Sequence, residues 1–175
     1  MKKNIRALLL FSIVIVALTA LLVFFNWLPF YIEEGIVRRY SSIEEVKAKL
    51  KLKEVFVPSF FPQQYVWPPY EIIAQTKPFT SVIMKFKNIN GKPDALVICQ
   101  LSATASVPDC LPSMIQIRES TAYKMKGRPA ILEVGTCGHN EVCSRMAWRE
   151  GRYRITVAVD APPSELVKIS GSMIQ

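Results

Sequence analysis

Residues 95–101 read ALVICQL, an apolar run that a single glutamine interrupts. Successive side chains of a strand point to opposite faces of a sheet, so a strand that is apolar at odd and even positions is buried on both faces. The run therefore predicts a central strand. The dipeptide Asn90-Gly91 before it favours a hairpin turn, so residues 81–87 are expected to be the preceding antiparallel strand.

Further short segments between turn signals also read as strands. They are residues 71–74, 115–117, 122–125, 130–134, 147–148 and 152–159, with turns at residues 127–129 and at Glu150-Gly151. Ser42 stands three residues before Glu45 in a capping-box pattern, which predicts a helix over residues 43–50. Pro162 and Pro163 precede a second helix over residues 164–173. The expected fold class is α+β, a twisted and mainly antiparallel sheet of six or seven strands packed on one side by two short helices.

Residues 7–25 read ALLLFSIVIVALTALLVFF and carry no charge. A helix of that length spans the roughly 30 Å hydrocarbon core of a bilayer, and the cations Lys2, Lys3 and Arg6 before it favour a cytoplasmic N-terminus. We expect a cytoplasmic tail (1–6), a transmembrane helix (7–27), a connector (28–40) and an extracytoplasmic domain (41–175) at the cell membrane. A cleaved signal peptide is the alternative.

The chain has 22 Lys and Arg against 14 Asp and Glu, a formal net charge of +8. No nucleic-acid-binding module accompanies that charge, so a nucleic-acid partner is not expected. All four cysteines follow the apolar run, and an even number suits two disulfides in an oxidising compartment. Three pairings are possible, and short loops favour Cys99 with Cys110 and Cys137 with Cys143.

The segment VPSFFPQQYVWPPY at residues 57–70 carries four prolines, which keep it out of helices. Its aromatic side chains are expected to close one edge of the core, and a ligand groove is the alternative. They are Phe60, Phe61, Tyr65 and Trp67.

The loop from Cys137 to Cys143 holds two thiols, His139 and Glu141, which could supply four metal ligands. The spacing matches no familiar metal motif, so a disulfide is the expected use of the thiols. Acidic residues that could pair for catalysis are scattered, namely Glu71, Asp94, Asp109, Glu119, Glu133 and Asp160. Since no catalytic motif is present, we expect no cofactor, no resident metal and no enzymatic activity.

Three strands carry basic residues two positions apart, which places both members of a pair on one face of a sheet. The pairs are Lys85 and Lys87, Lys124 and Lys126, and Arg152 and Arg154. If the strands share a sheet, its outer face is cationic and could bind anionic lipid headgroups or an acidic partner. A merely solvated face is the alternative.

The order of several motifs is similar to that of a known family. They are the helix SSIEEVKAKL, the segment VPSFFPQQY, a Tyr-x-Met-x-Gly-x-x-Ala turn at residues 123–130, Trp148 followed by Tyr153, and the closing helix SELVKISGSM. Over residues 41–173 the chain resembles a small bacterial extracytoplasmic domain of unknown function. That domain follows one membrane span in anti-sigma-factor-like and sporulation-associated proteins. The resemblance implies no catalytic residues.

These observations predict a non-enzymatic, single-span accessory or binding subunit. Its partners are expected to be the bilayer and a larger membrane complex or envelope protein. An extracytoplasmic sensory protein of the anti-sigma-like class is the second hypothesis, and an envelope enzyme is the third.

Overall fold

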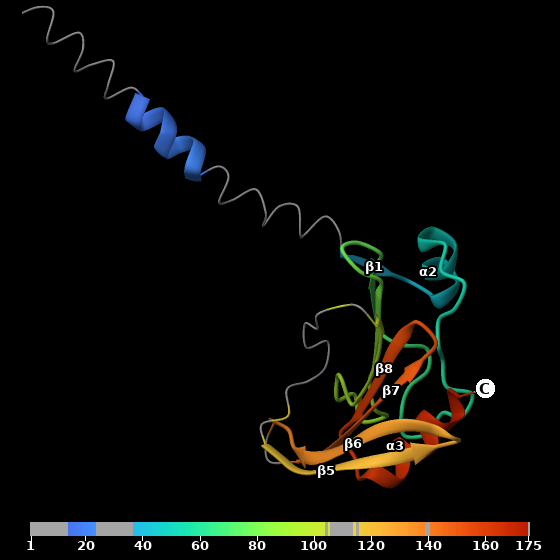
Figure 1. The fold of residues 1–175 in the computed structure, drawn as a ribbon. Helices are drawn as coiled ribbons and strands as arrows, with labels where there is room; N and C mark the ends of the chain where they lie inside the picture. The colour runs from blue at the N-terminus through green and yellow to red at the C-terminus, as the bar shows by residue number, and fades with distance from the viewer. Residues whose placement is uncertain are drawn as a thin grey trace, which may run out of the picture. The chain divides into compact units, whose positions relative to one another are not determined.

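The structure is a computed structural model that describes residues 14–23, 37–103, 105, 114, 116–138 and 141–174. The chain divides into two compact units, Met1–Val37 and Arg38–Gln175. In the second unit the elements follow in the order β1 (Arg38–Tyr40), α2 (Ile43–Leu50), β2 (Glu71–Gln75), β3 (Ser81–Phe86), β4 (Leu96–Ser102), β5 (Gln116–Met125), β6 (Arg128–Thr136), β7 (Val142–Glu150), β8 (Tyr153–Val159) and α3 (Pro163–Ser172) (Figure 1).

In the described part of the chain, eight strands form one sheet in the order β1-β2-β3-β4-β8-β7-β6-β5. Every neighbouring pair is antiparallel. The β4 strand lies between β3 and β8, and Leu96, Val97 and Cys99 are at most 1% exposed although they alternate between the two faces. The prediction of a central, doubly buried strand is therefore confirmed.

The sheet of the described residues has eight strands, so the expected number of six or seven is wrong, and two details of the expected strands change: β1 is added, and two short strands merge into β5. The three-residue strand β1 pairs with β2 but is too short to show an alternating pattern. Residues 115–117 and 122–125 were expected as separate strands, whereas Gln116–Met125 forms one strand with a register shift between Ile117 and Glu119. The edge strand β5 is exposed along nearly its whole length, so polar residues are tolerated throughout it. The sequence therefore lacks the apolar alternation that would have marked residues 116–125 as one strand.

Helix α2 has the predicted bounds, and helix α3 begins one residue earlier than expected, at Pro163. The Ser42 hydroxyl accepts a hydrogen bond from the Glu45 amide at 3.1 Å. The Glu45 carboxylate accepts in turn from the amide of Ser41 at 2.9 Å, one residue before the N-cap. The start of α2 is thus capped from both sides, as the sequence pattern indicates.

One face of the sheet packs against both helices. Ile43 and Val46 of α2 and Leu166 and Ile169 of α3 are buried in one hydrophobic cluster with alternate residues of the strands. These strand residues include Val82, Met84, Phe86, Leu96, Ile98, Met146, Trp148, Ile155 and Val157. Helix α2 contacts β1 and β2, whereas α3 contacts β7 and β8 (Figure 1). We call the opposite face of the sheet the outer face.

The proline-rich segment closes one edge of this cluster. Phe61 and Trp67 lie against Phe86, with ring centroids 5.1 and 5.9 Å apart, respectively. Tyr65 is buried, whereas Phe60 is 46% exposed. Phe61 and Tyr65 therefore pack as expected, Trp67 stacks on Phe86 but remains 49% exposed, and Phe60 does not pack as expected.

The expected fold class requires a second correction at the N-terminus. Among the described residues, no helix is both long enough and apolar enough to cross a membrane. The helix described inside the expected span covers residues 14–23, and at ~1.5 Å per residue that length is about 15 Å, half of the hydrocarbon core. Residues 7–13 and 24–27 of the expected span lie outside the described residues.

Candidate functional site

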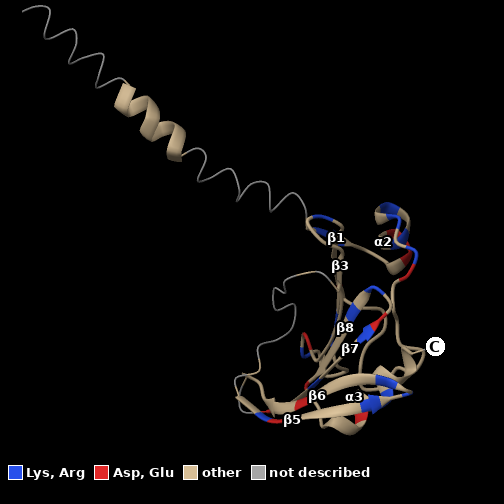
Figure 2. Ribbon diagram, viewed as in Figure 1, with Lys and Arg blue, Asp and Glu red and all other residues tan. Residues whose placement is uncertain are grey.

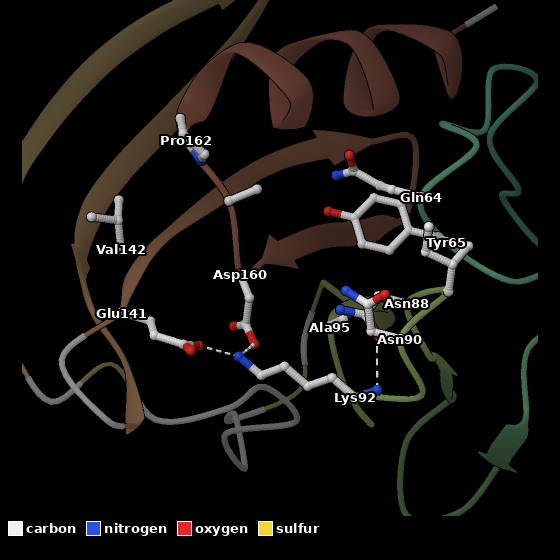
Figure 3. Close-up of a pocket in the computed structure, with 12 residues that line it drawn as sticks. Gln64, Tyr65, Asn88, Asn90, Lys92, Ala95, Glu141, Val142, Asp160 and Pro162 are labelled. Atoms are coloured by element: carbon white, nitrogen blue, oxygen red, sulfur yellow. Dashed lines mark hydrogen bonds and ion pairs between the residues drawn. The ribbon is translucent and has the colours of Figure 1, made fainter.

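A pocket of about 500 Å³ opens where four segments meet. Gln64 and Tyr65 come from the proline-rich segment, and residues 88–92 come from the turn between β3 and β4. The start of β7 supplies Glu141 and Val142, and residues 160–162 connect β8 to α3. Figure 3 shows the side chains of Tyr65, Lys92, Glu141 and Asp160 gathered around this space.

Lys92 joins two walls of the pocket. Its ammonium lies 2.9 Å from the Asp160 carboxylate and also forms an ion pair with Glu141 (Figure 3). The hydrogen bonds to Asp160 and then to Glu141 raise the pKa of Lys92 above its usual value. The protonated ammonium donates hydrogen bonds to both carboxylates and so links the two walls.

Tyr65 presents its hydroxyl to the same pocket (Figure 3). The residue is 6% exposed, and burial raises the pKa of the phenol, although a hydrogen bond from Gln64 acts in the opposite direction. The phenol therefore stays protonated and can donate as well as accept a hydrogen bond. The Tyr65 backbone is fixed by an isolated β-bridge to Asn88.

The cysteine-closed loop borders the pocket. Cys137 and Cys143 form a disulfide, as predicted, and the Cys137 amide donates to the Glu141 carbonyl at 3.0 Å. Cys99 is disulfide-bonded too, and its expected partner Cys110 lies outside the described residues, as does His139. Within the described residues no group of three or more His, Cys, Asp and Glu could hold a metal ion.

Among the described residues, four of the scattered carboxylates contact cations, and two of them share Lys85. Glu71 and Asp94 both contact Lys85, Glu133 contacts Arg145, and Asp160 contacts Lys92. Glu119 accepts from the Thr121 hydroxyl. Asp109 lies outside the described residues.

On the outer face, one row of charges is paired across the strands. Lys85 lies opposite Glu71 in the β2–β3 register, with the ammonium 3.1 Å from the carboxylate. Arg145 lies opposite Glu133 in the β6–β7 register at 2.6 Å. Opposite charges in facing positions stabilise a sheet, so these ion pairs have a sufficient structural explanation.

A second row, nearer the β7–β8 turn, is cationic. Arg149 of β7 and Arg154 of β8 face each other directly, and Lys124 lies on the same face opposite Pro129. None of the three forms an ion pair within the described part of the chain, and the buried Nη2 of Arg154 has no hydrogen-bond acceptor there. Figure 2 shows Lys and Arg on β7, on β8 and toward the tip of the β5–β6 hairpin. We call Lys124, Arg149 and Arg154 the cationic row.

The other basic residues expected on this face are engaged elsewhere. The Lys87 ammonium lies 4.9 Å from the centre of the Tyr70 ring, just after the end of β3. Lys126 occupies the β5–β6 turn with a positive φ and donates to the Ile174 carbonyl at 3.2 Å. Arg152 lies in the β7–β8 turn with its guanidinium 5.1 Å from the centre of the Tyr153 ring. The three expected pairs therefore contribute Lys85, Lys124 and Arg154 to the outer face.

Sequence reasoning missed Arg149 and the contacts of Lys92. The length of the β7–β8 turn could have identified Arg149. A two-residue turn at Gly151 and Arg152 sets the register of the hairpin so that Arg149 lies opposite Arg154. Lys92 and Asp160 lie far apart in the chain and belong to no local motif. Only the folded sheet brings them together.

No protein-family model, curated protein or solved structure matches this chain.

Proposed function

We propose that the unit of residues 38–175 is a non-enzymatic binding domain that docks on an acidic protein partner through the cationic row. The observation that carries the proposal is the direct juxtaposition of Arg149 and Arg154 with no ion pair to a described residue. Like charges in facing positions destabilise a sheet. A partner carboxylate between the two guanidinium groups would relieve that repulsion through charge-assisted hydrogen bonds.

The surroundings of the row favour a protein over a lipid surface. The outer face also carries Ile131, which is 55% exposed, and the paired acids Glu71 and Glu133. Exposed apolar area beside arginines is typical of protein interfaces, in which arginine is enriched.

The disulfides support an extracytoplasmic location for this domain. Disulfides such as the Cys137–Cys143 bridge and that of Cys99 form and persist mainly in oxidising compartments. We therefore place the partner among envelope or membrane-complex proteins.

The test compares two double variants of the full chain that lose the same net charge. Lys124→Ala/Arg149→Ala removes two members of the row, whereas Lys47→Ala/Lys168→Ala removes two exposed lysines from the helices. The probe is a ten-residue polyglutamate peptide, measured by fluorescence anisotropy at low and physiological salt. We expect binding by the wild type that weakens with salt, at least a tenfold loss in the row variant and no loss in the helix variant.

Two results would count against the proposal. An equal loss in both variants would mean that the peptide senses net charge alone. Binding to phosphatidylglycerol vesicles without binding to polyglutamate would assign the row to a lipid surface instead.

A further inference from the structure

We propose that the pocket between Tyr65, Lys92 and Asp160 binds an uncharged saccharide unit. Its volume of about 500 Å³ lies in the range of roughly 300 to 1,000 Å³ that is usual for small-molecule sites. It is formed at the end of the sheet where β4 begins and β8 ends. The cationic row lies at the other end of β8, so this inference does not depend on the proposed function.

The charges of the lining exclude an anionic ligand. The pocket has one cationic side chain, Lys92, and two carboxylates, Glu141 and Asp160. Both carboxylates already contact the Lys92 ammonium. The surplus of negative charge would therefore repel a phosphate or carboxylate ligand, whereas it would not repel a neutral ligand.

The hydrogen-bonding groups suit hydroxyls. Gln64, Asn88 and Asn90 carry amides that both donate and accept, and the protonated Tyr65 phenol does the same. The carboxylates of Asp160 and Glu141 add acceptors. Gln64 already donates to Glu165, and the Asn88 side-chain oxygen already accepts from the Lys92 amide. A sugar hydroxyl is at once a donor and an acceptor, so it can bond to the donors and acceptors that remain.

Apolar surface is available beside these polar groups. Ile89 is 66% exposed and Val142 is 45% exposed, and both line the pocket together with Pro162. The C–H face of a pyranose ring can pack on such side chains while its hydroxyls turn to the amides. The combination of apolar and neutral polar surface fits a sugar better than a purely apolar ligand.

The walls of the pocket are fixed before any ligand binds. The Ile89 amide donates to the Gln64 carbonyl at 2.9 Å, and the Lys92 amide donates to the Asn88 side chain at 2.8 Å. The disulfide of Cys137 and Cys143 encloses the loop that carries Glu141. Groups that are already held in position lose little entropy when a ligand binds, which favours recognition of a small molecule.

The test titrates the full chain with glucose, galactose and N-acetylglucosamine, followed by NMR of the protein amides. Glucose 6-phosphate is the charged counter-probe. We expect saturable binding of at least one neutral sugar, with shifts at residues 88–92 and 160–162, and weaker binding of the phosphorylated sugar.

Two variants examine the pocket itself. Asn90→Ala removes an amide from the turn, and Tyr65→Phe removes only the hydroxyl and keeps the buried ring. Each is expected to weaken sugar binding about fivefold, the effect of one lost hydrogen bond. Ser120→Ala on the exposed strand β5 is the matched control and should bind as the wild type does.

The inference is overturned if none of the three neutral sugars gives saturable shifts at tens of millimolar. It is also overturned if glucose 6-phosphate binds more tightly than glucose, or if both pocket variants bind like Ser120→Ala. Unchanged circular dichroism of Tyr65→Phe would show that its loss of binding does not come from unfolding.

Discussion

Gln100 is fully buried in β4, on the face that packs against the helices. Its side-chain carbonyl accepts from the Phe56 amide at 3.0 Å, and its amide donates to the Glu54 carbonyl at 3.0 Å. The glutamine thus ties the segment after α2 to the central strand. Replacing it with leucine keeps a similar volume and removes both hydrogen bonds.

The expected loss of stability follows from these two contacts. The bond to Glu54 contributes about 1 kcal/mol, and its carbonyl can turn to water because Glu54 is exposed. The Phe56 amide is partly buried and would lose its acceptor, which costs about 2 kcal/mol. We therefore expect Gln100→Leu to lower the free energy of unfolding by about 3 kcal/mol.

Urea denaturation followed by tryptophan fluorescence measures this change. With a slope of about 2 kcal/mol per molar urea, the midpoint should fall by about 1.5 M. Gln116→Leu on the exposed edge strand is the matched control and should change the free energy by less than about 0.5 kcal/mol. A Gln100→Leu midpoint within 0.3 M (about 0.6 kcal/mol) of the wild type would refute the assigned role of these hydrogen bonds.

Three further substitutions have defined outcomes. The Cys137→Ser/Cys143→Ser variant opens a loop with a sequence separation of 6, so urea unfolding should show a loss of about 2 kcal/mol; an unchanged midpoint would contradict the estimate. The hydrogen bond from Lys49 lowers the pKa of Glu45 from its usual 4.5 to about 2, so the stabilisation by this carboxylate is present above about pH 4.5 and is lost toward pH 2. Glu45→Gln should therefore lower the melting temperature at pH 7 and have no effect near pH 2, and a pH-independent difference would argue otherwise. Gly171→Ala in α3 meets no atom within 4 Å and should stabilise the protein by about 0.5 to 1 kcal/mol in the same urea assay; destabilisation would mean that the site is crowded.

Patterns that depend on neighbours in the chain identified much of the sheet. The apolar run of β4 and the capping box of α2 are local signals, and both elements lie where they were expected. Strand β5 shows where local signals end. It is the edge strand of the sheet formed by the described residues, and its side chains are exposed along nearly its whole length, so no apolar alternation marked its middle part.

The candidate sites were less predictable because they depend on register and on distant contacts. Alternation correctly places Arg154 and Lys124 on the outer face, but Lys126 and Arg152 fall in turns, where strand alternation does not apply. The pocket depends on an ion pair between Lys92 and Asp160, which only the pairing of β4 with β8 brings close.

The two candidate sites should act independently, because they occupy opposite ends of β8. Arg154 and Asp160 are six residues apart along an extended chain, or about 20 Å. That distance exceeds the roughly 8 Å Debye length at physiological salt, so the positive row and the acidic pocket hardly sense each other. We expect Lys124→Ala/Arg149→Ala to bind neutral sugars like the wild type and Asn90→Ala to bind polyglutamate like the wild type. Calorimetric titration of each variant with both probes measures the coupling, which should stay below about 0.5 kcal/mol. A larger coupling would mean that the eight-stranded sheet transmits a conformational change between its ends, and the sites could no longer be treated as separate.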